Sequence, residues 1–272
     1  MTNKVKPYKT TLDRSNAYWM ATFSKAVYTK KSDNDYTPDD ACILQSLKEK
    51  DSNFISVNGV SKNSAQAILI EHNDFFCMAF RGTDEIVDWL DNINAFREQV
   101  LFGEFHRGFW KSLEDVWQSL YDCYQTLFKQ SRRPLFLTGH SLGGAMATMA
   151  AAKLIHLDLP FTSVYTFGQP RAMSRDTSRI FNVECKSRFF RFQNNNDIVT
   201  RIPARLMGYS HVGSYIYISE EDELHNDPGF WFRFLDYLDG AVEAVREKGI
   251  DLIADHDMSN YLRAIQKWNI QF

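Results

Sequence analysis

Cysteine is scarce in this chain, and its few copies lie far apart in the sequence. None of them has the Cys-x-x-Cys spacing, and no histidines stand at the spacing of a zinc site. The pattern argues against a disulfide framework and a structural zinc centre, so we expect reduced thiols that act as packing groups. No metal ion and no organic cofactor is predicted. The cysteines are Cys42, Cys77, Cys123 and Cys185.

Blocks of like charge and long apolar runs are also missing. The formal net charge is −3 and the isoelectric point is near 6.2, with both signs interspersed. The sequence therefore lacks the cluster of basic residues that is typical of nucleic-acid binding. No apolar run reaches transmembrane length. Residues 1–11 are polar and lack the apolar core of a secretory signal. We therefore expect a cytoplasmic protein, with secretion that needs no signal peptide as the alternative. The oligomeric state stays open.

One stretch carries a clear chemical signature. A short apolar run, Leu135 to Leu137, leads into Gly139-His140-Ser141-Leu142-Gly143, and an alanine-rich run of helix formers follows. Ser141 is thus predicted on a tight turn from a strand into a helix. There the G-x-S-x-G pattern lets a strained backbone expose the hydroxyl as a nucleophile. The helix N-terminus would point at that hydroxyl, so the backbone N–H of Leu142 could receive an oxyanion.

The rest of the pattern indicates an α/β architecture. We expect an amphipathic helix over 15–28 and a second helix with Thr37 at its N-cap and Pro38 at its first position. Three strands, at 54–57, 65–70 and 75–80, would be separated by polar turns, one of them at Asn58-Gly59. Strands and helices alternate after the serine. One domain over 1–272 is predicted, with a mostly parallel central sheet, an antiparallel N-terminal part and helices on both faces.

The third of these strands ends in a glycine-bearing loop, Arg81-Gly82-Thr83. In the predicted architecture this loop supplies a second oxyanion donor, and Thr83 offers a backbone N–H and a hydroxyl together. An ordinary strand-end turn is the alternative.

Directly after this loop, apolar and acidic residues alternate at helical spacing. We interpret the segment at about 84–97 as a lid over an apolar site, which could contact a lipid surface transiently. A plain surface helix is the alternative. The apolar positions are Ile86, Trp89, Leu90 and Ile93.

A serine nucleophile needs a base, and the base needs a carboxylate. Asp197 follows a predicted strand directly, where catalytic groups of open α/β sheets gather. Of the later histidines, we rank His256 first, because it lies in a polar loop before the last helix, and His211 second. His225, in an acidic loop, is the weakest candidate.

Taken together, these motifs resemble those of the class 3 lipases, a branch of the α/β-hydrolases. The resemblance runs in the family's order over roughly residues 54–262. The motifs are Phe80-Arg81-Gly82-Thr83, Phe105-His106-Arg107-Gly108-Phe109, Gly139 to Ala145, Thr166 to Arg171, Asn196-Asp197-Ile198-Val199 with Pro203, and Asp255-His256.

The resemblance implies a hydrolase of acylglycerols or related lipid esters, with Ser141 as nucleophile, Asp197 as orienting acid and His256 as base. Thr83 and Leu142 would form the oxyanion hole, and the helix after Thr83 would be the lid. It also implies that His211 is not catalytic. A phospholipase A1 or galactolipase is the alternative activity, and a non-catalytic lipid-binding or protein-binding scaffold is a further one. An aromatic segment at 228–245 fits either a buried helix or a second apolar flap.

Overall fold

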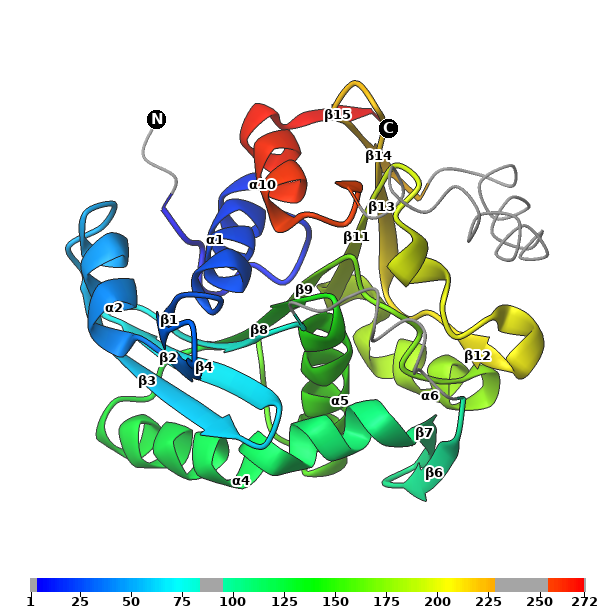
Figure 1. The fold of residues 1–272 in the computed structure, drawn as a ribbon, viewed down its shortest axis with the longest axis horizontal. Coiled ribbons are helices and arrows are strands. Elements are labelled where there is room, and N and C mark those ends of the chain that lie inside the picture. The colour runs from blue at the N-terminus through cyan, green and yellow to red at the C-terminus, as the bar shows by residue number, and fades with distance from the viewer. Residues whose placement is uncertain (1–3, 84–94, 228–253, 272) are drawn as a thin grey trace.

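A central sheet dominates the computed structural model, which describes residues 4–83, 95–227 and 254–271 (Figure 1). Among these residues the sheet has nine strands. Five neighbouring strands, β5, β8, β9, β11 and β13, run parallel, whereas β3 and β4 add an antiparallel edge. In sheet order they are β15 (Asn269–Gln271), β14 (Glu223–Asn226), β13 (Ser214–Ile218), β11 (Phe189–Asn194), β9 (Val164–Phe167), β8 (Leu135–His140), β5 (Phe76–Phe80), β4 (Ala65–His72) and β3 (Phe54–Lys62).

Helices cover both faces of this sheet, as predicted (Figure 1). The alternation of side chains along each strand explains why: in β4, Leu69 packs into the core on one face and Ile70 into the core on the other. One face is covered by α4 (Arg107–Gln130), α5 (Leu142–His156) and α6 (Arg175–Cys185). The other is covered by α1 (Arg14–Ala26), α2 (Asp40–Lys48) and α10 (Met258–Lys267).

The strand register brings the predicted site together at one edge of the sheet. Phe80, the last residue of β5, pairs with Gly139 near the end of β8, and Gly139 pairs with Thr166 of β9. Parallel strands end at the same edge, so the loops that follow Phe80, His140 and Phe167 emerge side by side. The sequence therefore places the loop of Thr83 next to the turn of Ser141.

Smaller elements surround the main sheet. The described residues also form a hairpin of β1 (Lys30–Ser32) and β2 (Asp35–Pro38), and a second sheet in the order β12 (Tyr209–Ser210), β10 (Met173–Ser174), β7 (Gly103–His106), β6 (Arg97–Val100). The short 3₁₀ helices are η1 (Lys186–Arg188), η2 (Ile198–Arg201) and η3 (Arg205–Met207).

The second helix begins later than predicted. Thr37 and Pro38 belong to β2, where Pro38 pairs with Lys30. The N-cap is Asp39, whose side chain accepts a hydrogen bond from the Cys42 N–H. The hairpin pairing holds Thr37 and Pro38 in an extended conformation, so the next residue able to cap takes the role.

The turn predicted at Asn58-Gly59 is wrong, because β3 continues through both residues to Lys62. A tertiary contact with Asp40 explains why a glycine occupies this position in the strand. Its N–H donates to Asp40 Oδ2 at 3.0 Å, and a Cβ at this position would collide with the same carboxylate. The glycine therefore allows α2 to approach the strand closely. A strand, β14, also replaces the loop predicted around His225.

Three further predictions concern the lid, the aromatic segment and the absence of a membrane-spanning helix. The lid residues Ile86, Trp89, Leu90 and Ile93 lie outside the described residues, as does the whole aromatic segment at 228–245. In the ranges that are described, no helix combines the length and the apolar character needed to cross a membrane.

Candidate active site

Ser141 sits on a strained turn between β8 and α5. Its φ and ψ are 58° and −131°, a backbone conformation that side-chain-bearing residues rarely adopt and that marks functional sites. The turn is compact because glycines flank it. A Cβ on Gly139 would overlap the carbonyl of Gly143, and a Cβ on Gly143 would overlap the carbonyl of Phe80. The G-x-S-x-G pattern thus lets α5 begin directly against the sheet.

Two backbone donors predicted for an oxyanion lie on either side of this serine. Leu142 is the first residue of α5, and the first N–H groups of a helix have no partner within the helix. Thr83 follows β5 through Gly82, which lies against the turn: a Cβ on Gly82 would stand 2.8 Å from Ser141 Cβ. The structure therefore brings both predicted loops to the serine.

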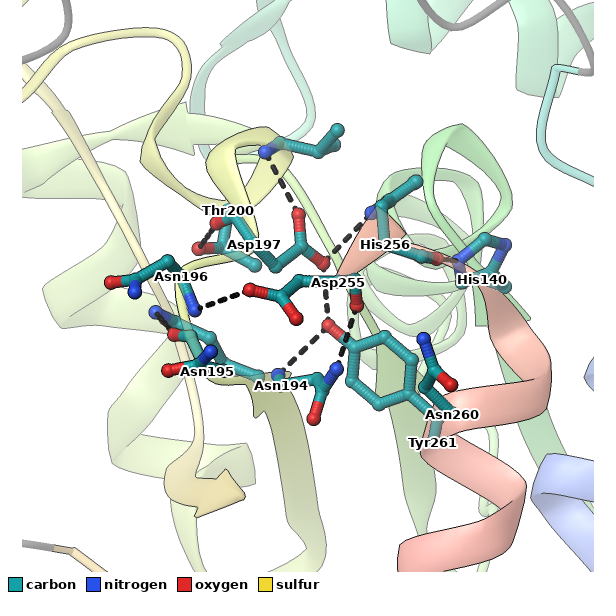
Figure 2. A network of polar contacts seen from close by, with 12 residues as sticks. His140, Asn194, Asn195, Asn196, Asp197, Thr200, Asp255, His256, Asn260 and Tyr261 are labelled. Atoms are coloured by element: carbon teal, nitrogen blue, oxygen red, sulfur yellow. Dashed lines mark hydrogen bonds and ion pairs between the residues drawn. The ribbon is translucent and has the colours of Figure 1, made fainter. Parts of the chain in front are cut away.

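Asp197 and His256 form a fully buried pair (Figure 2). His256 Nδ1 lies 2.8 Å from Asp197 Oδ2, and neither side chain is exposed to solvent. Asp197 follows β11 and caps η2 by accepting the Val199 N–H at 2.9 Å. His256 lies in the loop before α10. Because a carboxylate only accepts, Nδ1 carries the proton of this bond, and Nε2 is the ring nitrogen left to act as a base.

The loop of His256 is fastened to the end of β11. Asn194 Nδ2 donates to the backbone oxygen of Asp255 at 2.9 Å, and the Asn196 N–H donates to Asp255 Oδ2 at 3.1 Å (Figure 2). The neighbouring residue His256 is thereby held beside Asp197. These two hydrogen bonds help to fix the position of the His256 ring, and the sequence pattern did not indicate them.

Tyr261 contributes a second donor to the carboxylate. Its hydroxyl donates to Asp197 Oδ2 at 2.5 Å and accepts the Asn194 N–H at 3.0 Å (Figure 2). Burial alone would raise the pKa of Asp197, but His256 and the hydrogen bonds from His256 and Tyr261 outweigh it and lower that pKa. Burial and the adjacent carboxylate raise the pKa of Tyr261. The acid is therefore ionised and the tyrosine stays a donor.

Ser141 and His256 both adjoin the turn after β9. The Ser141 N–H donates to the Phe167 oxygen at 2.9 Å, and a Cβ on the next residue, Gly168, would stand 2.7 Å from His256 Cε1. Within the described part of the chain, Ser141 Oγ and His256 Nε2 are buried without a hydrogen-bond partner. Such an unused donor and acceptor can engage a substrate, since catalytic hydrogen bonds often tighten only in the complex.

His140, next to the serine, is a functional candidate that the sequence reasoning missed. It is buried, its Nε2 lies 2.7 Å from the backbone oxygen of His256, and the two rings lie 4.4 Å apart. Its Nδ1 lies 2.9 Å from the Tyr28 hydroxyl. Burial and the neighbouring His256 lower the pKa of His140 to about 3, so the ring is neutral at ordinary pH. Its position inside G-x-S-x-G was the one available signal.

The other histidines serve elsewhere. His211 Nε2 lies 2.7 Å from the Thr200 backbone oxygen, and burial together with Arg191 and Arg171 holds its pKa well below the usual range. No contact joins it to Asp197 among the described residues. His106 caps α4, where its Nδ1 accepts the Phe109 N–H at 3.3 Å.

A groove of about 810 Å³ opens beside the pair. Thr83, His140 and His256 contribute to its lining, together with residues of α1, α2 and α10. Apolar side chains from all three helices, among them Ile43 and Leu262, contribute to the lining. The groove can hold a largely apolar molecule with one end at the candidate site.

Comparison with known proteins relates part of this chain to one family. Residues 77–207, which include the elbow and Asp197, match the family model of lipase (class 3). The match to the class 3 lipases extends over just under half of the chain. The chain is 27% identical over 162 residues to the secreted mono- and diacylglycerol lipase A of Penicillium cyclopium, covering 58% of this chain and 52% of that protein. It is 28% identical over 148 residues to a chloroplastic phospholipase A(1) of Arabidopsis thaliana, covering 46% and 33%.

Solved structures show the same architecture. The triacylglyceride lipase of Rhizomucor miehei matches this chain with a TM-score of 0.62 at 22% identity, over 75% of this chain and 79% of that one. The predicted α/β-hydrolase fold is thereby confirmed. The chain spans about half the length, or less, of the two relatives compared by sequence. The roles of the individual site residues in this protein stay predictions.

Proposed function

We propose that this protein is a class 3 lipase, a serine hydrolase that cleaves carboxylic ester bonds of acylglycerols or related lipid esters. One observation carries the proposal: a buried Asp197–His256 pair, whose Nε2 has no partner among the described residues, adjoins the turn that holds a strained, buried serine. This is the arrangement that a nucleophile, a base and an orienting acid require. The names of the relatives, a mono- and diacylglycerol lipase and a phospholipase, point to lipid esters.

The proposed reaction runs through an acyl-enzyme. Ser141 Oγ attacks the ester carbonyl carbon while His256 Nε2 takes the hydroxyl proton, and Asp197 stabilises the imidazolium. The carbonyl oxygen becomes an oxyanion that the N–H groups of Thr83 and Leu142 receive, each donor lowering the barrier by about 3 kcal/mol. The tetrahedral species then expels the alcohol, which takes the proton from His256. Water, activated by the same base, hydrolyses the acyl-serine.

Hydrolysis of p-nitrophenyl butyrate and of emulsified diolein tests the proposal. We expect both to be cleaved, and Ser141→Ala to lower the rate by at least about 10⁴-fold without loss of folding. The control is Ser112→Ala, because Ser112 lies on the exposed part of α4, where its hydroxyl contacts only the Gly108 oxygen among the described residues. A Ser141→Ala variant that keeps the wild-type rate would refute the mechanism.

A phospholipase A1 activity is a second candidate, favoured by the groove. Lys25 and Lys50 line it, and neither forms an ion pair within the described residues: Lys25 Nζ donates to Ser259 Oγ at 3.1 Å, and Lys50 Nζ lies 5.9 Å from the Tyr18 ring centroid. Asp257 is the acidic residue of the same lining. Because its lining carries two lysines and one carboxylate, the groove favours an anionic phosphate group over a neutral headgroup.

Assays on phosphatidylglycerol and diolein side by side distinguish the two activities. If the groove serves a phospholipid, Lys25→Ala/Lys50→Ala lowers kcat/KM on phosphatidylglycerol by about tenfold or more and leaves diolein unchanged, because only the former loses charge-assisted contacts. Equal effects on both substrates would reject the phospholipid preference. Lys48→Ala, on the exposed side of α2 and outside the groove lining, is the matched control.

A further inference from the structure

Three hydrogen bonds link the parts of the active site without using the side chains of Ser141, Asp197 or His256. The Tyr28 hydroxyl accepts the Gly82 N–H at 3.1 Å and pairs with His140 Nδ1 at 2.9 Å. His140 Nε2 pairs with the backbone oxygen of His256 at 2.7 Å. Tyr28 lies just beyond α1, so an N-terminal element reaches into a site whose other members come from β5, β8 and the loop before α10.

The direction of each bond follows from the chemistry of the groups. A backbone carbonyl only accepts, so His140 Nε2 must carry the proton it shares with His256. The buried ring is neutral, and a neutral imidazole has a single N–H, so Nδ1 is an acceptor. The Tyr28 hydroxyl must then donate to Nδ1, while its oxygen accepts from Gly82. One tautomer and one hydroxyl orientation satisfy all three bonds.

We propose that Tyr28 and His140 are positioning residues, which hold the oxyanion loop at Gly82-Thr83 in register with the loop of the base, His256. The inference rests on the proposed function. The network joins three loops that must act together: the loop of the oxyanion donor, the turn of the nucleophile that follows His140, and the loop of the base. Neither side chain is assigned contact with the reacting atoms.

Such positioning matters because donors to an oxyanion act only over a narrow range of distance. A shift of about 1 Å in a donor or a base can reduce a rate by about 100-fold. Removing the Tyr28 hydroxyl leaves both the Gly82 N–H and His140 Nδ1 without this partner. Burying unpaired polar groups is unfavourable, so the loop of Gly82 would move to find another partner. Thr83, the next residue, would move with it.

Tyr28→Phe is the direct test, because it removes one oxygen atom and keeps the ring. We expect kcat for p-nitrophenyl butyrate to fall about 10- to 100-fold, a part of the loss seen when an oxyanion donor is deleted. KM should change by less than about twofold, since the interaction acts in the transition state. Tyr18→Phe, in the preceding helix α1, is the control; its ring stands outside the groove lining, and its kcat should match the wild type.

Two substitutions of His140 separate the two halves of the network. His140→Gln can still donate to the His256 oxygen from the ε position but offers Tyr28 no acceptor at the δ position. His140→Asn does the reverse. In the Gln background Tyr28→Phe removes only the bond to the Gly82 N–H, whereas in the Asn background it removes that bond and the bond to residue 140. Tyr28→Phe should therefore lower kcat further in the Asn background than in the Gln background, and a double-mutant cycle measures this coupling. An equal further loss in both backgrounds would overturn the inference.

Circular dichroism and thermal unfolding show whether each variant is folded, and rates are compared below the unfolding transition. If Tyr28→Phe lowers thermal stability, the rate at which a fluorophosphonate labels Ser141, per folded molecule, replaces kcat as the readout. A folded Tyr28→Phe variant with wild-type kcat, in a protein whose Ser141→Ala variant is inactive, refutes the positioning role alone. Hydrolysis that survives Ser141→Ala refutes the proposed function instead.

Discussion

The hydroxyl of Tyr261 lies 2.5 Å from Oδ2 of Asp197, the same oxygen that receives the proton-bearing nitrogen of His256. The two residues are 64 positions apart in the chain, yet both are fully buried. The carboxylate thus receives two donors at one oxygen and a third, the Val199 N–H, at the other. These donors keep Asp197 ionised in a place where burial alone would favour its protonated form.

Replacing Tyr261 by Phe should weaken both catalysis and stability. The carboxylate loses a donor and the Asn194 N–H loses its acceptor, so we expect the free energy of unfolding to fall by about 1–3 kcal/mol. We expect kcat/KM to fall about tenfold, because a less firmly held Asp197 orients His256 less well. Urea unfolding and ester hydrolysis measure the two effects. Tyr8→Phe, at a side chain that is 81% exposed, should change neither; a Tyr261→Phe variant equal to the wild type in both would contradict this role.

The buried, neutral ring of His140 predicts a pH dependence of stability. Its pKa is lowered from 6.5 to about 3 in the folded protein, so below pH 6.5 the unfolded chain takes up a proton that the folded protein does not. Its contribution to stability is complete above pH 6.5 and is lost progressively as the pH falls toward 3. The loss between pH 7 and pH 5 should be about 2 kcal/mol.

Urea unfolding of the wild type and of His140→Asn at pH 7 and pH 5 measures this contribution. The variant lacks the titrating ring, so its stability should fall by about 2 kcal/mol less over this interval than that of the wild type. The pKa values of His72 and His211 are also lowered in the folded protein, but both residues are present in both proteins, so their contributions to the pH dependence cancel in the comparison. Equal pH dependence in both proteins would show that His140 is protonated alike in the folded and unfolded states.

The choice of base can be tested between the two histidines that the sequence left in competition. His256→Ala should lower kcat by about 10⁴-fold or more, because the serine loses its proton acceptor. His211→Gln should retain kcat per folded molecule, since that ring bonds to Thr200 and not to the carboxylate. Steady-state hydrolysis with folding checked by circular dichroism decides; a His211→Gln loss as large as that of His256→Ala would reverse the assignment.

Local sequence patterns were sufficient to predict the elbow and its surroundings. Ser141 was predictable because glycines, a buried strand and a helix-forming run lie within a few residues of it. Asp197 was predictable because it follows a strand, and the sheet register then brings the strand ends together. These signals are short in range and repeat from element to element, so the α/β-hydrolase fold and the candidate site could be derived together.

What the sequence did not indicate are contacts between distant segments. Tyr28 and His140 are 112 positions apart, and neither tyrosine of the site belongs to a motif with a chemical signature. Asn58-Gly59 has the composition of a turn, but the approach of Asp40 makes glycine necessary inside a strand. In each case the decisive partner comes from another element, so no pattern of neighbouring residues contains the information.

The central claim is that Ser141 is a nucleophile activated by His256, and covalent labelling tests it most directly. The protein is treated with a fluorophosphonate probe, digested, and analysed by mass spectrometry for the modified residue. The account predicts one adduct per chain, on Ser141, whose formation is abolished in Ser141→Ala and slowed by more than about 100-fold in His256→Ala. Absence of labelling at Ser141 in an active preparation, or labelling at the wild-type rate in His256→Ala, would contradict it.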